Sequence, residues 1–451
     1  MIAVNTSESI TKLDPYLEQF KRFENEAGQP PWLVSIRRAG FARFSEMGYP
    51  TSQQEDWRFT NIAPLAKLPF HPVFKSDADG LTSEMVRRFG FANLPGSKLV
   101  FVNGHYSREL STISPLPDGV MAGSLATALA ADRGLIERHL TRYVPVDANA
   151  FAALNAAFFK DGAFIHVPAG RTVSDPIQLV FISTSSESVA TIHPRNLIVA
   201  EPDSRLTVVE TYASASNAAC VTNAVTELLA GDGAVVEHLK FQNEGRGAFH
   251  VATIHGQFGG ASRVNLHSFA LGARLSRNNI RATLAGEGLE CVLNGLYLTR
   301  GEQIADHHMI VEHAQPRCAS HEYFNGILDD KSKGVFHGRI LVQPVAQKTD
   351  AKQTNKNLLL SDEATVDTKP QLEIYADDVK CTHGATIGQM NEQSIFYLRA
   401  RGIGLEKARQ MLMHAFAGEI IDRVKCEPVR EALDKLVWDR LEENPSIAEK
   451  K

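Results

Sequence analysis

Hydrophobic and polar positions follow three successive patterns along the chain. Up to about residue 160, apolar residues recur at helical spacing, as in DPYLEQFKRFENEA and PPWLVSIRRAGFARFSEMG, which end near Gly28 and Gly48. Short runs that alternate apolar and polar residues then replace the helical pattern, which is typical of β-strands. After residue 390 the helical spacing returns. The pattern predicts a mainly helical domain over 1–160, a β core over 161–390 and a helical domain over 391–451.

Glycines punctuate the β core at a nearly constant interval. They occur at positions 231, 245, 259, 272, 286 and 301, and each interval has room for one strand and one turn. Such regularity indicates a stacked, repetitive architecture. Two intervals per coil would build a β-solenoid, whereas an antiparallel sandwich also has short strands at such intervals. Spacing alone leaves both architectures open.

Helical segments are predicted on both sides of this core. They cover 124–143, 149–162, 391–402, 405–424 and 427–443, and the tail 444–451 is expected to fray. A helical appendage behind a solenoid can cap the exposed end of the sheets and can offer a surface to a partner.

Composition places the chain among ordinary globular proteins. It has 451 residues, 43% of them hydrophobic and 22% charged, with a formal net charge of -5. With a net negative charge, the chain has no overall positive potential that would attract nucleic acid. The first residues resemble neither a signal peptide nor a transit peptide, and no run approaches the ~18 apolar residues of a membrane span. A cytoplasmic location, with no membrane and no nucleic-acid partner, is expected.

The five cysteines, at 220, 291, 318, 381 and 426, are widely spaced and form no C-x-x-C pair. A secreted disulfide framework is therefore not expected. Phosphate-binding and hydrolase motifs such as G-x-x-x-x-G-K-[ST], G-x-S-x-G and H-E-x-x-H do not occur. The chain is accordingly expected to have no nucleotide site and no catalytic site of its own.

Histidines gather in the β core, notably in DHHMIVEH. Neighbours on a strand face opposite ways, so Asp306 and His308 could approach one ion, while His307 would face the other side. Polar positions on a partly exposed strand are the simpler interpretation. We expect His337, which lies between glycines, to be a polar residue beside a turn.

Two pairs of aspartates raise the alternative of a β-solenoid carbohydrate-active enzyme. Asp329 adjoins Asp330, and Asp377 adjoins Asp378. Glycoside hydrolysis needs two carboxylates roughly 5 to 9.5 Å apart across a cleft. Adjacent aspartates in LDDKSKG and YADDVK are more typical of turns.

The segment DDVKCTHGAT holds the most specific candidate for metal chemistry. Cys381 and His383 are separated by one residue, so on a strand both side chains would face the same way. A thiolate and an imidazole are ligands for zinc, iron or an iron–sulfur cluster. Two ligands do not complete a site, and taken alone such a pair is more often a buried thiol beside a histidine than a set of ligands.

Three segments resemble the SufB/SufD family of iron–sulfur cluster assembly proteins. They are PTSQQEDWRFTNIAPL, ALNAAFFKDGAFIHVPAGRTVSDPIQLVF and the long block from KTDAKQTNKNLLL to YLRARGI. Within the family the chain is similar to the SufD branch. No cysteine precedes Cys220, Asn355 stands where SufB members carry an important cysteine, and Gly384 stands where they carry a glutamate.

The resemblance implies a right-handed parallel β-helix between helical segments. It also implies a non-catalytic scaffold subunit that pairs with SufB and docks the ATPase SufC on its C-terminal helices. His383, and less securely Cys381, would be metal ligands at the interface with SufB, and Leu412, Phe416 and Ile420 are assigned to the SufC dock.

The same resemblance implies a transient iron–sulfur cluster at the SufB interface and no cofactor in the isolated chain. A flavin in the assembled complex is a further cofactor that it allows, and a cysteine desulfurase system would be an indirect partner. A stand-alone homodimeric adaptor is kept as an alternative to the heterodimer.

Overall fold

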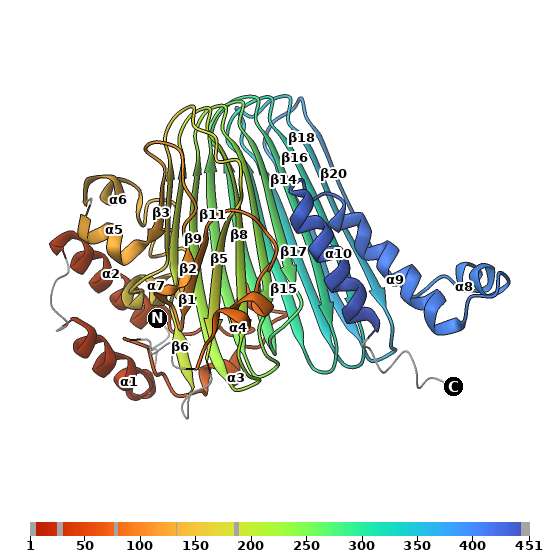
Figure 1. The fold of residues 1–451 in the computed structure, drawn as a ribbon, viewed down its shortest axis with the longest axis horizontal. Coiled ribbons are helices and arrows are strands. Elements are labelled where there is room, and N and C mark those ends of the chain that lie inside the picture. The colour runs from red at the N-terminus through yellow and green to blue at the C-terminus, as the bar shows by residue number, and fades with distance from the viewer. Residues whose placement is uncertain (1–5, 25–29, 76–79, 132, 185–188, 443–451) are drawn as a thin grey trace.

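The computed structural model describes residues 6–24, 30–75, 80–131, 133–184 and 189–442, and its centre is a parallel β-solenoid (Figure 1). From β7 onward, successive strands alternate between two long sheets, named sheet A and sheet B here, so that each turn adds one strand to each sheet. Helices lie before and after the solenoid in the chain. The predicted fold class, a mainly β solenoid between helical segments, is confirmed.

The strands of the two sheets have the following bounds. Sheet A runs β3 (Met121–Ser124), β4 (Ala163–Val167), β7 (Arg195–Ala200), β9 (Cys220–Ala230), β11 (Phe249–Phe258), β13 (Leu275–Leu284), β15 (Ile304–His313), β17 (Lys333–Val342) and β19 (Thr365–Ile374), and β6 (Ala190–Ile192) pairs with β9. Sheet B runs β2 (His105–Thr112), β1 (Lys98–Val102), β5 (Ile177–Ser183), β8 (Arg205–Ser214), β10 (Val235–Asn243), β12 (Arg263–Ala270), β14 (Glu290–Thr299), β16 (Ala319–Leu328), β18 (Asp350–Leu359) and β20 (Lys380–Gly388).

The register explains the regular glycine interval. Val235 pairs in parallel with Arg205 and with Arg263, so one solenoid turn takes up two of the glycine intervals. Glycines are required where turns stack, because a Cβ on Gly259 would lie 2.7 Å from the backbone nitrogen of Asp232 in the turn below. Since these strand pairs are parallel, the antiparallel sandwich that spacing left open is wrong.

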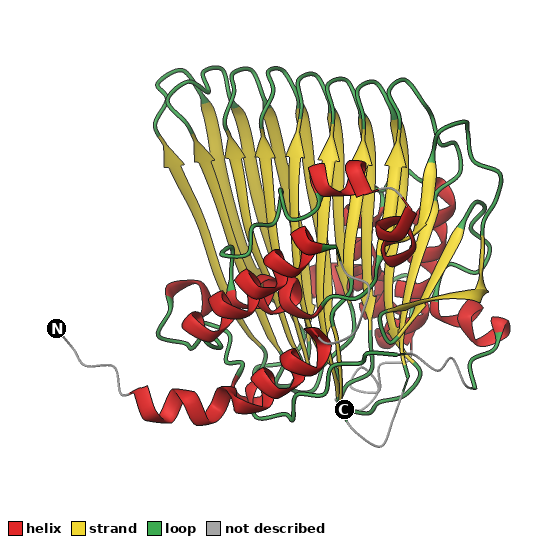
Figure 2. Ribbon diagram, turned by 90° about the vertical axis from the view of Figure 1, so that its left-hand side faces the viewer, coloured by secondary structure: helices red, strands yellow, loops and turns green. Residues whose placement is uncertain are grey.

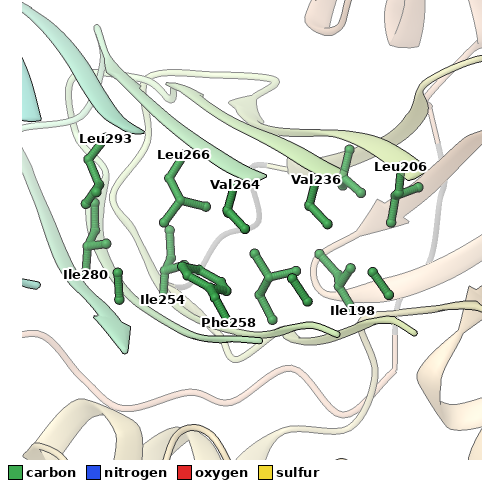
Figure 3. Close-up of a cluster of buried hydrophobic side chains, with 14 of the residues drawn as sticks. Ile198, Leu206, Val236, Ile254, Phe258, Val264, Leu266, Ile280 and Leu293 are labelled. Atoms are coloured by element: carbon green, nitrogen blue, oxygen red, sulfur yellow. The ribbon is translucent and has the colours of Figure 1, made fainter. Parts of the chain in front are cut away.

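The space between the sheets is filled mainly by apolar side chains. In Figure 3, Leu206, Val236, Val264, Leu266 and Leu293 of sheet B face Ile198, Ile254, Phe258 and Ile280 of sheet A. These residues occupy alternate positions of their strands, as a period of two requires. Some inward positions are polar but paired: the Lys240 ammonium donates to Asn278 over 2.8 Å, and His238 lies 2.8 Å from Glu210.

Most of the region before residue 160 covers the outer face of sheet A. Its helices are α1 (Thr6–Glu24), α2 (Pro31–Met47), η1 (Glu55–Trp57), α3 (Ala63–Ala66), α4 (Ser83–Phe89), α5 (Leu125–Ala131), α6 (Arg133–His139) and α7 (Ala150–Phe158). Helices of this region lie in front of the sheet in Figure 2, starting beside the N-terminus. Trp57, Phe151 and Leu65 pack there on Val251 and Leu275. Val86 of helix α4 packs instead on Val100 and Val180 of sheet B.

Details of this region differ from the prediction. The single helix expected over 124–143 is divided into α5 and α6, and strands β1 to β3 already extend both sheets before residue 161. The division into domains at 160 and 390 stays a prediction. Gly28, the expected end of the first helix, and the tail 444–451 lie outside the described residues.

A buried ion pair fixes the N-terminal region to the solenoid. Arg195 of β7 and Glu227 of β9 have no solvent exposure, and their nearest charged atoms are 2.7 Å apart. The Glu227 carboxylate also accepts from the backbone N–H groups of Thr141, Tyr143 and Val144. Several donors are needed to offset the desolvation of a buried carboxylate, and here they tie segment 141–144 to sheet A.

Three helices follow the solenoid: α8 (Glu392–Arg399), α9 (Leu405–Ile421) and α10 (Glu427–Glu442). The expectation that they cap the end of the sheets is wrong. Helices α9 and α10 lie on the outer face of sheet B, where Ile421 and Leu433 pack with Phe241, Leu296 and Ile327. Figure 1 shows α9 running past the last strands to α8, which stands clear of them. No helix among the described residues has the length and apolar character needed to cross a membrane.

Candidate functional site

Within the described part of the chain, the solenoid is open at its C-terminal end. Strand β19 is the last strand of sheet A and β20 the last strand of sheet B, so each is paired along one edge only. Most side chains of β19 are partly exposed. Those of β20 are exposed, except that Cys381 is half-buried. Pro370 lies in β19, and proline is tolerated in an edge strand because one row of N–H groups there has no partner strand.

Strand β20 carries both predicted ligands on the side that continues the interior. Its register pairs Cys381 with Ala351 and His383 with Gln353 of β18, and both of those partners are buried between the sheets. Cys381 and His383 therefore face the same way, as predicted from their spacing. They lie at the open end, where no further turn covers them.

The two side chains have different surroundings. The Cys381 thiol packs beside Ile340, Val342 and Ala351, and burial, followed by the charge of Asp350, raises its pKa above the ordinary value. A thiol with a raised pKa stays protonated at neutral pH and is a poor metal ligand until a metal or a nearby cation lowers that pKa. His383 is exposed, and within the described part of the chain no group is hydrogen-bonded to its ring.

Two buried polar residues lie directly beneath His383 and were not singled out in the sequence. Gln353 and Glu322 occupy the same register position in the two preceding turns, and the Gln353 amide donates to the Glu322 carboxylate over 2.6 Å. Burial raises the pKa of Glu322 to about 8, against the opposing effect of that hydrogen bond. Glu322, Gln353 and His383 follow one another at intervals of one solenoid turn in the sequence. That repeat was the signal from which Glu322 and Gln353 could have been identified.

Stability should therefore depend on pH through Glu322. Its pKa is about 8 in the folded state and about 4.3 in an unfolded chain, so the folded state holds the proton more tightly and loses stability as pH rises from 5 to 8. Glu322→Gln removes the charge and keeps the shape. We expect the stability of the variant relative to the wild type to grow between pH 5 and pH 8, by on the order of 3 kcal/mol.

Thermal unfolding of both proteins between pH 5 and 8 measures this difference. Glu363→Gln is the matched control, because the Glu363 side chain is 66% exposed and pairs with the exposed Lys331. A Glu322→Gln variant whose melting temperature tracks the wild type at every pH would show that Glu322 is ionised throughout.

The other predicted site residues lie on α9. Ile420 is 1% exposed and belongs to the cluster that packs against sheet B, while Phe416 and Leu412 are partly covered. The backbone carbonyl of Phe416 accepts a hydrogen bond of 2.9 Å from Asn325 of β16. The side chain of Ile420 thus attaches α9 to the solenoid, and the docking role given to the three residues stays a prediction.

The remaining histidine and aspartate candidates are placed as follows. Asp306 and His308 do not share a site, because Asp306 binds the Arg277 guanidinium at 2.6 Å and His308 faces Asp56. His337 lies in the middle of β17, so its expected position beside a turn is wrong. Asp329, Asp330, Asp377 and Asp378 all lie in turns, as their pattern indicated.

Comparison with known proteins then places the chain in a family. Residues 181–416 match the family model for the SUF system FeS cluster assembly SufBD core domain, and residues 11–179 match that for the SufBD protein N-terminal region. The chain belongs to the SufBD family. The recognition made from its sequence motifs is confirmed, and the family match favours cluster assembly over the carbohydrate-active alternative.

Relatives of this SufBD protein are named as cluster assembly proteins. A SufBD family iron–sulfur cluster assembly protein of Synechocystis is 32% identical over 437 residues, covering 95% of each chain. The iron–sulfur cluster assembly protein SufD of Escherichia coli is 32% identical over 403 residues, with 87% of this chain and 90% of the relative covered. SufD of Bacillus subtilis is 28% identical, with 95% and 98% covered. The chain is thus SufD-like and a member of the Suf assembly system.

One of the positions predicted to distinguish this SufBD chain from SufB members is buried. Asn355 of β18, predicted to stand where SufB has a cysteine, has no exposure and faces the interior of the solenoid. Its amide donates to the carbonyl of Phe324 over 3.2 Å, and its carbonyl accepts from Asn357 over 2.7 Å. These hydrogen bonds satisfy a polar group in the core, which is a structural role.

Proposed function

We propose that this protein is the SufD-type scaffold subunit of a Suf complex. It pairs with a SufB-type chain through the open end of its solenoid, contributes the His383 imidazole to a cluster built there, and carries the SufC ATPase on its C-terminal helices. The cluster is cargo that is assembled and passed on. The observation that carries the proposal is the open end itself, which presents two edge strands and two potential ligands together.

Edge strands support pairing with another chain. An unpaired strand edge offers a row of N–H and C=O groups, and proteins normally cover or charge such edges. Beside charged residues such as Lys369 and Lys380, this end also carries exposed apolar side chains, with Tyr375 62% exposed, Ile387 48% and Ile374 39%. A partner strand would satisfy the backbone groups and would bury these side chains.

The donors at this end support shared ligation of iron. A neutral imidazole suits iron as a ligand, and a thiolate suits iron–sulfur clusters. Only two donors, Cys381 and His383, come from β20, so the remaining ligands would come from the partner chain. His383 is the exposed member and the better placed of the two to meet them.

The C-terminal helices support a second docking surface. Helix α8 stands clear of the strands, and its Phe396 and Tyr397 side chains are 73% and 55% exposed (Figure 1). Exposed aromatic side chains are typical anchors of protein interfaces.

Placing charge on α8 should separate the two docking events. The double variant Phe396→Asp with Tyr397→Asp is expected to weaken SufC binding by about a thousandfold, because aromatic anchors contribute about 2 kcal/mol or more each, or about 4 kcal/mol together. The melting temperature of this variant should stay close to that of the wild type, because substitutions of exposed residues usually change stability by no more than about 0.5 kcal/mol. Tyr375→Asp, equally exposed but at the open end, is the matched control and should keep SufC while losing SufB.

Co-expression with SufB and SufC, followed by purification of the native complex, tests the proposal as a whole. We expect both partners to co-purify and the chain alone to hydrolyse no ATP. Recovery of a homodimer that excludes SufB would favour the stand-alone adaptor. ATP turnover by the chain free of SufC would contradict the scaffold assignment.

A further inference from the structure

Three potential metal ligands meet on the outer face of sheet A, one strand before its open end. They are Asp56 of η1, His308 of β15 and His337 of β17, and their nearest ligand atoms all lie within 4.8 Å of one another. His308 Nε2 is 3.2 Å from the Asp56 carboxylate, and the two imidazole rings are perpendicular with centroids 4.4 Å apart. Both histidines are more than nine-tenths buried.

The fold brings these residues together from distant segments. His308 and His337 are separated by one solenoid turn, and they are direct register partners on adjacent strands. The segment that carries Asp56 is held over them by its neighbours. Trp57 is buried with the Arg277 guanidinium 3.8 Å above its ring, and Glu55 pairs with Lys369 of β19 at 2.5 Å.

We propose that Asp56, His308 and His337 form a binding site for a divalent first-row transition-metal ion. Two imidazoles and one carboxylate are a donor set for Fe²⁺, Zn²⁺ or Co²⁺. Because the protein supplies three ligands, the remaining coordination positions of the ion are open to water or a small molecule. A calcium or magnesium site would instead be built from oxygen ligands.

The electrostatic surroundings favour a cation at this point. The Asp56 carboxylate is the charged donor of the site, and His308 Nε2 faces it at 3.2 Å. The neighbouring carboxylates are paired elsewhere, Glu55 with Lys369 and Asp306 with Arg277.

The site has a route to solvent and a fourth oxygen within reach. A cavity of about 350 Å³ opens beside it, lined by Asp56 and His308 together with Tyr143, His255 and Arg281. The Gln371 side-chain oxygen lies 3.4 Å from His337 Nε2. Closing the ligand atoms around an ion would also link the N-terminal segment to the solenoid, so bound metal should stabilise that contact.

Cobalt is a suitable probe because its visible absorption reports nitrogen and oxygen ligation. The metal-free full-length chain should bind one Co²⁺, with absorption bands and a rise in melting temperature that both saturate at one equivalent. Asp56→Asn and His337→Ala should each weaken this binding by at least about tenfold. Asp56→Asn matters most, because Asp56 is exposed and its replacement preserves shape and fold.

Two histidine variants separate this site from others. His321→Ala, on the opposite outer face, and His383→Ala, at the open end, should both leave the cobalt spectrum and affinity unchanged, so the inference does not depend on the proposed assembly function. Failure to bind cobalt, or binding that survives both Asp56→Asn and His337→Ala, would overturn it. Loss of the signal in His383→Ala alone would place the metal at the open end instead.

Discussion

Replacing His383 with alanine is expected to abolish iron–sulfur cluster formation in cells while the Suf complex is still recovered intact. The imidazole is the exposed donor on the last strand, and alanine leaves no ligand atom in its place. The fold should tolerate the change within about 0.5 kcal/mol, because an exposed residue at a strand edge adds little to the core. Complementation of a strain that lacks this protein measures cluster formation, and purification of the complex from the same cells measures assembly.

Matched variants define what this result means. Cys381→Ala should be milder than His383→Ala if the thiol only packs beside Ile340 and Val342. His321→Ala, a histidine on the outer face of sheet B, should complement fully. Full complementation by His383→Ala would refute the ligand role, and loss of activity together with loss of the complex would make His383 a structural residue of the interface.

Much of the solenoid could be predicted from the spacing of its residues. The glycine interval is half a turn because stacked turns leave no room for a Cβ, as at Gly259. The alternation of apolar positions identified the strands but not the way they pair, since parallel and antiparallel strands share a period of two. Parallel pairing became apparent only with the register, in which Val235 neighbours Arg205 and Arg263.

Contacts between distant segments could not be predicted in the same way. The apolar stripe of α9 indicates that the helix is covered on one side, but Ile420 could have packed on the end of the sheets as well as on their face. By contrast, the local spacing was enough to predict that Cys381 and His383 share a side. Nothing local brings Asp56 to His308, because the N-terminal segment that carries Asp56 crosses sheet A only in the folded chain.

Charge at the open end should strongly weaken pairing with SufB. In the double variant Ile374→Lys with Ile387→Lys, two ammonium groups replace apolar side chains on the last strand of each sheet. Burying either lysine against a partner strand would cost several kcal/mol without a matching carboxylate, and natural proteins use lysine at strand edges to block such contacts. We expect association to weaken by at least about a hundredfold, or roughly 3 kcal/mol.

Because the Ile374 and Ile387 side chains are exposed, replacing them with lysine should have little effect on the stability of the folded chain. Ile374 and Ile387 are 39% and 48% exposed, so melting temperature and SufC binding should stay near the wild-type values. Ile113→Lys is the matched control, since Ile113 is 47% exposed but follows β2 at the opposite end of sheet B. Co-purification and light scattering measure the outcome. If the double variant at Ile374 and Ile387 still pairs with SufB while Ile113→Lys does not, the two chains meet at the other end of the solenoid. His383 would then be too far away to share a cluster with the partner.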